Sequence, residues 1–329
     1  MSDRPAAVRA APPGWRTALA VAAAVAALAG LIAWLSMGSG GLAKDFTLPW
    51  TAARHLLAGR DPYVAMQPTG VYPFNVPFYY PLPAAVLAVP FAALPATMAG
   101  VAFVALSFGV AALVLVRENA GRLVILFGFP AVMAAVLGQW SPLLVAATVA
   151  PVLQFVLPVK PTLGAAVFVS RPSRVGVLVS IVILAVCFAI VPGWVGSWRA
   201  AVAGAWATYT PPVRWAGGAG FVLLGALVWW RDRDARLLAL MAIAPQLPLF
   251  YDQLLVHAVA RTRREAWLLV AAGWLGGLVW AFQGTPSAGG ERPARTLILA
   301  AIYLPALVVV AWRHLRRAPR TDEERGPSA

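Results

Sequence analysis

One stretch of the chain, residues 44–63 (KDFTLPWTAARHLLAGRDPY), gathers side chains that move protons and bind anions. It contains two aspartates, Asp45 and Asp61, together with a lysine, two arginines and a histidine. Carboxylates act as general bases, and guanidinium or ammonium groups bind phosphates and other anions. Only 12% of the whole chain is charged. The stretch is therefore the first place to look for a functional site.

Several of these residues also have a purely structural interpretation. Asp45 precedes a helical pattern, so its carboxylate is suited to cap the N-terminus of a helix. Asp61 stands before Pro62 and is typical of a turn. His55 falls on the polar face of the expected helix, where it would simply be solvated. The sequence leaves both interpretations open.

Lysine is rare in this chain, and one of the two lysines lies in an apolar stretch. Lys160 stands between Pro158 and Pro161, with hydrophobic residues on both sides. An ionisable side chain at membrane depth is costly and marks a functional site by default. The alternative is a lysine at a helix end whose ammonium group reaches the membrane surface.

The composition indicates a protein that crosses a membrane several times. Hydrophobic residues make up 61% of the chain and the mean hydropathy is +0.77, whereas soluble domains carry about 25% charged residues. The net charge of +14 comes almost entirely from arginines. These gather in short clusters at the ends of apolar runs, as the positive-inside rule requires of cytoplasmic loops. We therefore reject nucleic acid as a partner.

The arginine clusters also predict the topology in a cell membrane. We expect a cytoplasmic tail over residues 1–17, a single polytopic membrane domain over 18–312, and a second cytoplasmic tail over 313–329. The longest outer loop, residues 37–81, contains the stretch described above. The single cysteine, Cys187, excludes an intramolecular disulfide.

The predicted fold class is all-α, a transmembrane helical bundle with about eight to eleven membrane segments. Several apolar runs are short and interrupted by proline or glycine, which favours broken or re-entrant segments around a cavity. In the outer loop, Trp50 and Leu57 share the apolar face of an amphipathic helix that we expect to lie in the membrane interface. The clear spans are expected at 18–35, 97–116, 175–191, 217–230, 266–282 and 295–312.

The outer stretch has the pattern D-F-x-x-x-W-x-A-A-R-x-L-L-A-G-x-D-P-Y, followed by aromatic–proline pairs. This pattern resembles the first extracytoplasmic loop of family-87 glycosyltransferases. LGQWSPLL (137–144), KPTLG (160–164) and YDQLL (251–255) agree with that family in their order. Its members are integral-membrane enzymes of the GT-C fold that take sugars from polyprenyl-phosphate donors.

The resemblance implies an activity and a place for it. It implies a hexosyltransferase-type enzyme that moves a mannose- or arabinose-like sugar to a lipid or glycan acceptor on the extracytoplasmic face. It also implies that Asp45 is the catalytic base. Among the acids that the predicted topology places outside, Asp252 and then Asp61 are the further candidates for this role.

The same resemblance suggests roles for the other polar candidates. The expected phosphate ligands are Lys160, Arg54, Arg60 and His257. The expected substrate ligands are Gln139, Trp140, Tyr251, His55 and Asp61. The sequence has no metal-ligand cluster and no phosphate-binding glycine loop, so we expect neither a metal nor a cofactor.

Two other classes of function remain as alternatives. A transporter or flippase for a lipid or small solute would also use broken helices and a buried lysine. The sequence shows no inverted repeat and no chain of acids within the membrane, which disfavours transport. A non-catalytic membrane scaffold would use the charged loop to bind a partner. For the enzyme, the expected partners are the lipid-linked donor, the acceptor and membrane lipids.

Overall fold

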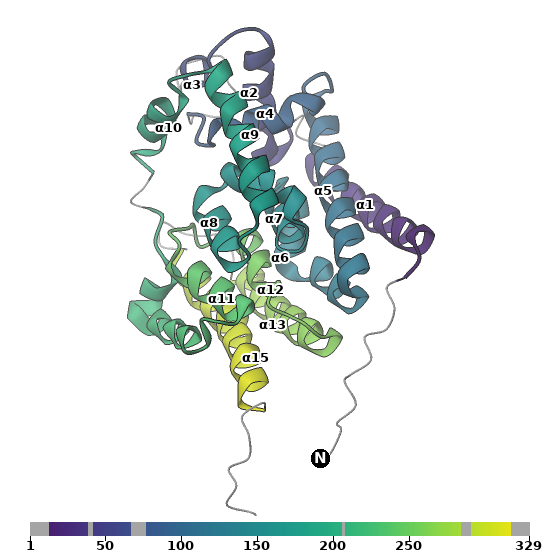
Figure 1. Ribbon diagram of the computed structural model, residues 1–329, viewed down its shortest axis with the longest axis vertical. Helices are drawn as coiled ribbons and strands as arrows, with labels where there is room; N and C mark the ends of the chain where they lie inside the picture. Colours follow the sequence, from purple (N-terminus) through teal and green to yellow (C-terminus); the bar gives the residue numbers. More distant parts are fainter. Residues whose placement is uncertain (1–12, 39–41, 67–76, 206–207, 284–290, 317–329) are drawn as a thin grey trace, which may run out of the picture.

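The computed structural model describes residues 13–38, 42–66, 77–205, 208–283 and 291–316, with only the backbone for 291–293 (Figure 1). Within these ranges the chain is helical, apart from connecting turns and one isolated antiparallel bridge between Thr210 and Gln246. The predicted all-α class is thus confirmed.

The elements are, in chain order and with 3₁₀ segments written η, α1 (Trp15–Met37), η1 (Lys44–Phe46), α2 (Thr47–Leu57), α3 (Pro62–Ala65), α4 (Leu82–Ala88), η2 (Val89–Phe91), α5 (Ala96–Asn119), η3 (Ala120–Phe127), α6 (Phe129–Leu137), α7 (Ser141–Ala147), η4 (Pro151–Val159), α8 (Pro161–Ser170), α9 (Arg174–Ile190), α10 (Trp194–Val202), η6 (Pro212–Arg214), η7 (Ala216–Trp229), α11 (Arg233–Ile243), η8 (Phe250–Gln253), α12 (Leu254–His257), α13 (Arg263–Phe282), α14 (Glu291–Ile298), the π-helical segment η9 (Leu299–Tyr303) and α15 (Leu304–Leu315).

Four helices of the described chain are long and apolar enough to cross a membrane. They are α1, the run Ala96–Phe127 that contains α5, α13, and the run Ala294–Leu315 that ends with α15. Helices α9 and α10 meet at an angle of 94° and make a fifth if the bent pair counts as one span. The predicted spans at 18–35, 97–116, 266–282 and 295–312 all coincide with these helices.

The shorter apolar segments are helical but broken. The run predicted at 217–230 forms η7, which is 14 residues long and contains a kink at Gly217 and Gly218, both with positive φ. Proline occupies the first turn of α6, α7 and α8, where its fixed φ and missing N–H are tolerated. The interruptions expected from proline and glycine are therefore present.

Helices α1 and α5 lie side by side along much of their length. Small residues allow this close approach. A Cβ atom placed on Gly109 would lie 3.2 Å from the Cβ of Ala26, and one on Gly30 would lie 3.4 Å from that of Ala105. Contacts through small residues are typical of helix pairs in membranes, where the hydrophobic effect does not drive association.

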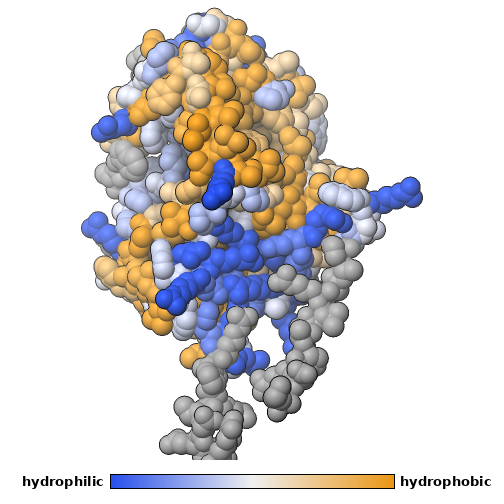
Figure 2. Space-filling view, viewed as in Figure 1, coloured by the Kyte–Doolittle hydropathy of each residue, from blue (hydrophilic) through white to orange (hydrophobic). Residues whose placement is uncertain are grey.

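Ion pairs join α11, α13 and α15, which Figure 1 draws toward one end of the molecule. Asp234 is buried and accepts hydrogen bonds from the guanidinium groups of Arg261 and Arg313, the latter at 3.0 Å. Arg313 also reaches Glu265 at 3.1 Å. It was expected to begin the C-terminal tail, but it lies within α15 and is buried. In the view of Figure 2, a hydrophilic band crosses the lower part of the molecule, below a broad hydrophobic surface.

The stretch 44–63 forms η1, α2 and the beginning of α3, toward the opposite end of the molecule (Figure 1). Asp45 lies in η1 and does not cap α2, since that helix has no side-chain cap. Asp61 caps α3, because its Oδ1 accepts a hydrogen bond from the backbone N–H of Tyr63 at 2.8 Å. Asp61 therefore caps a helix, whereas Asp45 does not.

Candidate functional site

Four polar side chains from distant parts of the sequence form one connected cluster. Gln139 Nε2 donates a hydrogen bond to Asp45 Oδ2. Lys160 Nζ donates to Gln139 Oε1 at 2.8 Å and to Asp252 Oδ1 at 2.6 Å. Ser141 Oγ lies 3.4 Å from the same Asp252 oxygen. We call Asp45, Gln139, Lys160 and Asp252 the polar cluster.

The position of Asp45 is fixed by its neighbours in the chain. Lys44 has a φ of 50°, in the left-handed region that non-glycine residues rarely adopt. On the other side of Asp45, Phe46 is fully buried and stacks on Phe103 with ring centroids 4.0 Å apart. Thr47 Oγ1 accepts a hydrogen bond from the backbone N–H of Ala43 at 2.8 Å. These contacts fix the turn that carries Asp45.

Gln139 reaches Asp45 because α6 ends in a glycine. Gly138 has a φ of 65° and closes the helix, while the backbone N–H of Gln139 donates to the carbonyl of Ala134 at 2.9 Å. This is the usual way in which glycine ends a helix. A Cβ on Gly138 would lie 3.0 Å from the carbonyl oxygen of Ala43 and 3.2 Å from Phe46 Cβ. The absence of a side chain brings the two segments together.

The other half of the polar cluster comes from two further breaks in helical structure. Lys160 occupies the junction between η4 and α8, directly before Pro161. Asp252 lies in η8 and is 7% exposed. The ammonium group of Lys160 also lies 4.8 Å from the centre of the Tyr251 ring, within the range of a cation–π contact.

The polar cluster borders a cavity of about 240 Å³. Three of the four members, Asp45, Lys160 and Asp252, line it. The remaining wall is mainly apolar and aromatic: Leu48, Tyr79, Tyr80, Pro81, Val159, Pro161, Thr162, Leu163, Trp198, Val202, Tyr209, Gln246, Leu247 and Tyr251. An apolar cavity with a few convergent charged groups is the usual form of a small-molecule site.

Electrostatics distinguish the two carboxylates of the cavity. Asp252 is directly paired with the ammonium of Lys160. Asp45, which lies outside the long apolar helices, has a pKa raised above its usual range, chiefly because burial disfavours its charged form. The charge of Asp252 adds to this increase, while Lys160 and the hydrogen bond from Gln139 oppose it. Asp45 therefore binds a proton more readily than a solvated aspartate does.

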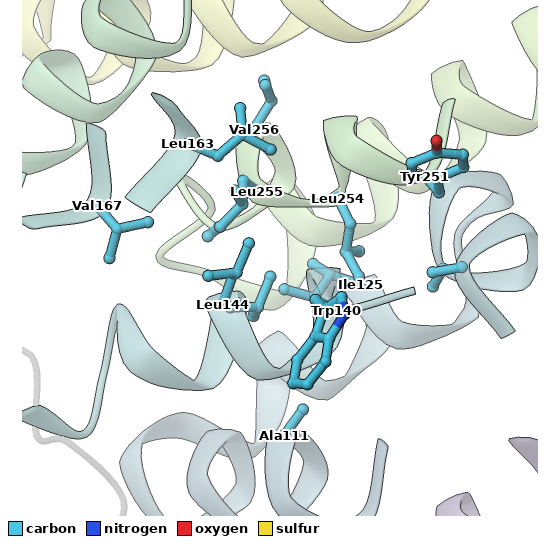
Figure 3. Close-up of a cluster of buried hydrophobic side chains, with 14 of the residues drawn as sticks. Ala111, Ile125, Trp140, Leu144, Leu163, Val167, Tyr251, Leu254, Leu255 and Val256 are labelled. Atoms are coloured by element: carbon cyan, nitrogen blue, oxygen red, sulfur yellow. The ribbon is translucent and has the colours of Figure 1, made fainter. Parts of the chain in front are cut away.

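Five of the predicted site residues thus lie at the cavity or in the polar cluster: Asp45, Gln139, Lys160, Tyr251 and Asp252. Trp140 follows Gln139 in sequence but lies in the buried apolar cluster drawn in Figure 3, close to Phe103. Its ring is therefore part of the core and does not line the cavity.

The other predicted residues lie away from the cavity wall. His257 is fully buried in α12, beside Gly128 and Gly273. Arg54 is exposed and its guanidinium lies 4.9 Å from the centre of the Trp50 ring. Further members of this group, none of which lines the cavity, are His55, Arg60 and Asp61.

Sequence reasoning did not select several residues that line the cavity. Tyr80 belongs to the aromatic–proline pairs that follow the outer stretch. Trp198 donates a hydrogen bond from Nε1 to the carbonyl of Tyr79 at 3.0 Å. Tyr209 comes from the loop after α10. Tyr79 and Tyr80 stand in the motif FYYP (78–81), which sets them apart in the sequence. No comparable motif surrounds Trp198 or Tyr209.

Within the described chain, no group of three or more histidine, cysteine, aspartate or glutamate side chains is arranged to hold a metal ion. Comparisons of the chain with protein-family models, with curated proteins and with solved structures gave no match.

Proposed function

We propose that the chain is a membrane glycosyltransferase of the GT-C type, which moves a sugar from a polyprenyl-phosphate donor to a hydroxyl of a lipid or glycan acceptor. One observation carries the proposal: a lysine and a half-buried aspartate with raised proton affinity face the same largely apolar cavity. Such a reaction requires a base for the acceptor, a cation for the phosphate and apolar surface for the lipid.

The proposed reaction is a substitution at the anomeric carbon. The acceptor hydroxyl oxygen forms a bond to that carbon while the bond from the carbon to the phosphate oxygen breaks. The electron pair of the broken bond leaves with the phosphate, which departs as polyprenyl phosphate. The hydroxyl proton passes to the carboxylate of Asp45, acting as general base.

Lys160 is suited to receive the phosphate in this reaction. An ammonium group has three N–H donors, and two of them contact Gln139 and Asp252. The third is available for a phosphate oxygen at the cavity. Asp252 then serves to hold the ammonium in place, which leaves Asp45 as the base.

The apolar wall of the cavity supports a donor with a lipid chain. Leu48, Val159 and Leu247 offer no hydrogen-bonding side chains, so they favour a hydrocarbon over a second polar group. In this proposal the cavity opens at the extracytoplasmic side. The short helices between the long spans complete a GT-C-like bundle of about eight to eleven segments.

The test compares Asp45→Asn with Asp61→Asn in purified protein supplied with a polyprenyl-phosphate sugar and an acceptor. Asparagine at 45 keeps the size and can still accept the hydrogen bond from Gln139, but it cannot take a proton. We expect sugar transfer to fall by ~10²–10⁴-fold in Asp45→Asn. We expect little change in Asp61→Asn, because that carboxylate only caps α3.

The wild-type pH profile gives a second measure of the same step. The carboxylate of Asp45 is the active form, and burial raises its pKa. Transfer should therefore decline as the pH falls through this raised value, at a pH above the ordinary range near 4. Near-normal transfer by Asp45→Asn would contradict the proposal. Loss of transfer in Asp252→Asn alone would instead make Asp252 the base.

A further inference from the structure

The side-chain amide of Gln139 has only one orientation that satisfies both of its neighbours. Lys160 has no acceptor, so its ammonium must face the amide oxygen. That contact directs the NH₂ group away from Lys160 and toward Asp45. Gln139 is 1% exposed, so water does not compete for these bonds. The contact with Lys160 therefore determines that the NH₂ group of Gln139, and not its oxygen, faces Asp45.

We propose that Gln139 is a positioning residue that transmits the fixed orientation of Lys160 to Asp45, holding the Asp45 carboxylate in place and favouring its ionised form. This inference rests on the proposed function, since it concerns the same site. It replaces the expectation that Gln139 binds the sugar, because both ends of the amide are already engaged by protein groups.

The chain holds Gln139 rigidly enough for this role. Gly138 ends α6 in a left-handed conformation, and the Gln139 backbone is tied to Ala134. Directly after it, the ring of Trp140 is 2% exposed and packs on Phe103, with centroids 4.6 Å apart. The amide is therefore anchored on both sides along the chain.

The proton affinity of Asp45 responds to every charged or titratable group facing it. The charged groups that act on it are the ammonium of Lys160, at the junction of η4 and α8, and the carboxylate of Asp252 in η8. Tyr80, Tyr209 and Tyr251 line the same cavity. Gln139 donates a hydrogen bond to the Asp45 carboxylate, and a donor to a carboxylate stabilises its charged form.

The test uses two variants that remove the donor in different ways. Gln139→Leu removes both amide contacts. Gln139→Glu keeps an acceptor for Lys160 but places a second carboxyl group where the N–H donor was. Gln154→Leu is the matched control, because Gln154 is equally buried and its side-chain amide donates a hydrogen bond to the carbonyl of Arg171, without lining the cavity.

The readout is the ionisation of Asp45 itself, measured in the whole protein by infrared spectroscopy. The carboxylic C=O band that disappears in Asp45→Asn identifies the residue, and its intensity is followed against pH. We expect the midpoint to rise by about one to two pH units in Gln139→Leu, the equivalent of one lost hydrogen bond to a charged group. In Gln139→Glu the rise should be at least as large. Gln154→Leu should titrate as the wild type does.

Sugar transfer supplies the second readout. The midpoint of its pH profile should move upward with the infrared midpoint, and the plateau at high pH should fall about 10-fold in Gln139→Leu as the carboxylate loses its fixed position. An unchanged infrared midpoint in Gln139→Leu, or a wild-type profile in Gln139→Glu, would overturn the inference. So would an equal shift in Gln154→Leu.

The two proposals fail separately. If the wild-type protein transfers no sugar, the proposed glycosyltransferase function fails, while the infrared titration still decides whether Gln139 controls Asp45. If transfer depends on Asp45 but the Gln139 variants titrate normally, the function stands and the positioning role is wrong.

Discussion

At the scale of single residues, Asp45 and Asp252 carry the same carboxyl group but have different neighbours. Asp252 touches an ammonium group at 2.6 Å, so its charge is compensated. Asp45 is connected to the same ammonium only through Gln139. Partial burial of Asp45 raises the pKa of its carboxyl group, because it disfavours the charged form. In the proposed reaction, Asp252 therefore holds Lys160 and Asp45 accepts the proton.

Lys160→Met tests the proposed phosphate contact. Methionine keeps most of the side-chain volume but removes the charge, and it leaves the carboxylate of Asp252 uncompensated at the cavity. We expect donor affinity to fall about 10- to 100-fold, as for the loss of one charge-assisted hydrogen bond. Binding of the polyprenyl-phosphate sugar to purified protein is the measurement.

The chain offers a matched control for this variant, because it contains only one other lysine. Lys44 is exposed and does not line the cavity. Lys44→Met should bind the donor as the wild type does. Equal affinity in Lys160→Met and the wild type would assign Lys160 a merely structural part in pairing Asp252.

Residue types and motifs were sufficient to select Asp45, Gln139, Lys160 and Asp252, which the fold brings into one cluster. They were not sufficient to separate Gln139 from Trp140. The two are adjacent, yet α6 ends just before Gln139 and α7 begins just after Trp140, so their side chains point to different surroundings. A sequence pattern gives no direction for side chains at such a junction, because direction there depends on tertiary packing.

At the scale of elements, the cluster is built from breaks in helices. Asp45, Lys160 and Asp252 lie in or beside 3₁₀ segments, and Gln139 follows a helix end. Proline and glycine in the sequence predicted that such breaks would exist. Their exact bounds could not be predicted, because 3₁₀ and α segments share the same apolar residues and differ mainly in how neighbouring helices confine them.

Gly138→Ala tests whether the end of α6 brings the cluster together. A side chain here is disfavoured by the positive φ, and its Cβ would also press on the backbone of Ala43 and on Phe46. We expect a loss of about 1–2 kcal/mol in stability from the left-handed backbone alone. We also expect a ~10²-fold loss of transfer, because displacement of residues 43–46 moves Asp45.

Gly59→Ala separates the two effects. Gly59 has a similar φ of 69°, but a Cβ there would meet nothing within 4 Å. It should lose a similar amount of stability in thermal unfolding and retain transfer. If both variants keep full activity, the contact between Gly138 and the turn around Asp45 does not determine the site.

At the scale of the whole molecule, two polar centres lie in different parts of an apolar body. One is the cavity with its polar cluster, and the other is the network around Asp234 that joins α11, α13 and α15. The positive-inside rule predicts that arginines gather on one side, but it does not predict that buried carboxylates hold them. Most arginine partners of Asp232, Asp234 and Glu265 are distant in the chain, so no local pattern reveals these ion pairs.

The separation of these centres makes the topology testable with two labelling sites. In a Cys187→Ala background, single cysteines would replace Arg60, which is exposed after α2, and Arg264, which is exposed at the start of α13. Neither residue lines the cavity, and neither belongs to the network around Asp234.

If the arginine-rich end is cytoplasmic, an impermeant thiol reagent added to intact cells should label Arg60→Cys and spare Arg264→Cys. Both should react after the membrane is permeabilised, which shows that each thiol is accessible. The reverse pattern would place the turn carrying Asp45 on the cytoplasmic side and rule out a reaction with a donor presented outside, whatever the chemistry of the cavity.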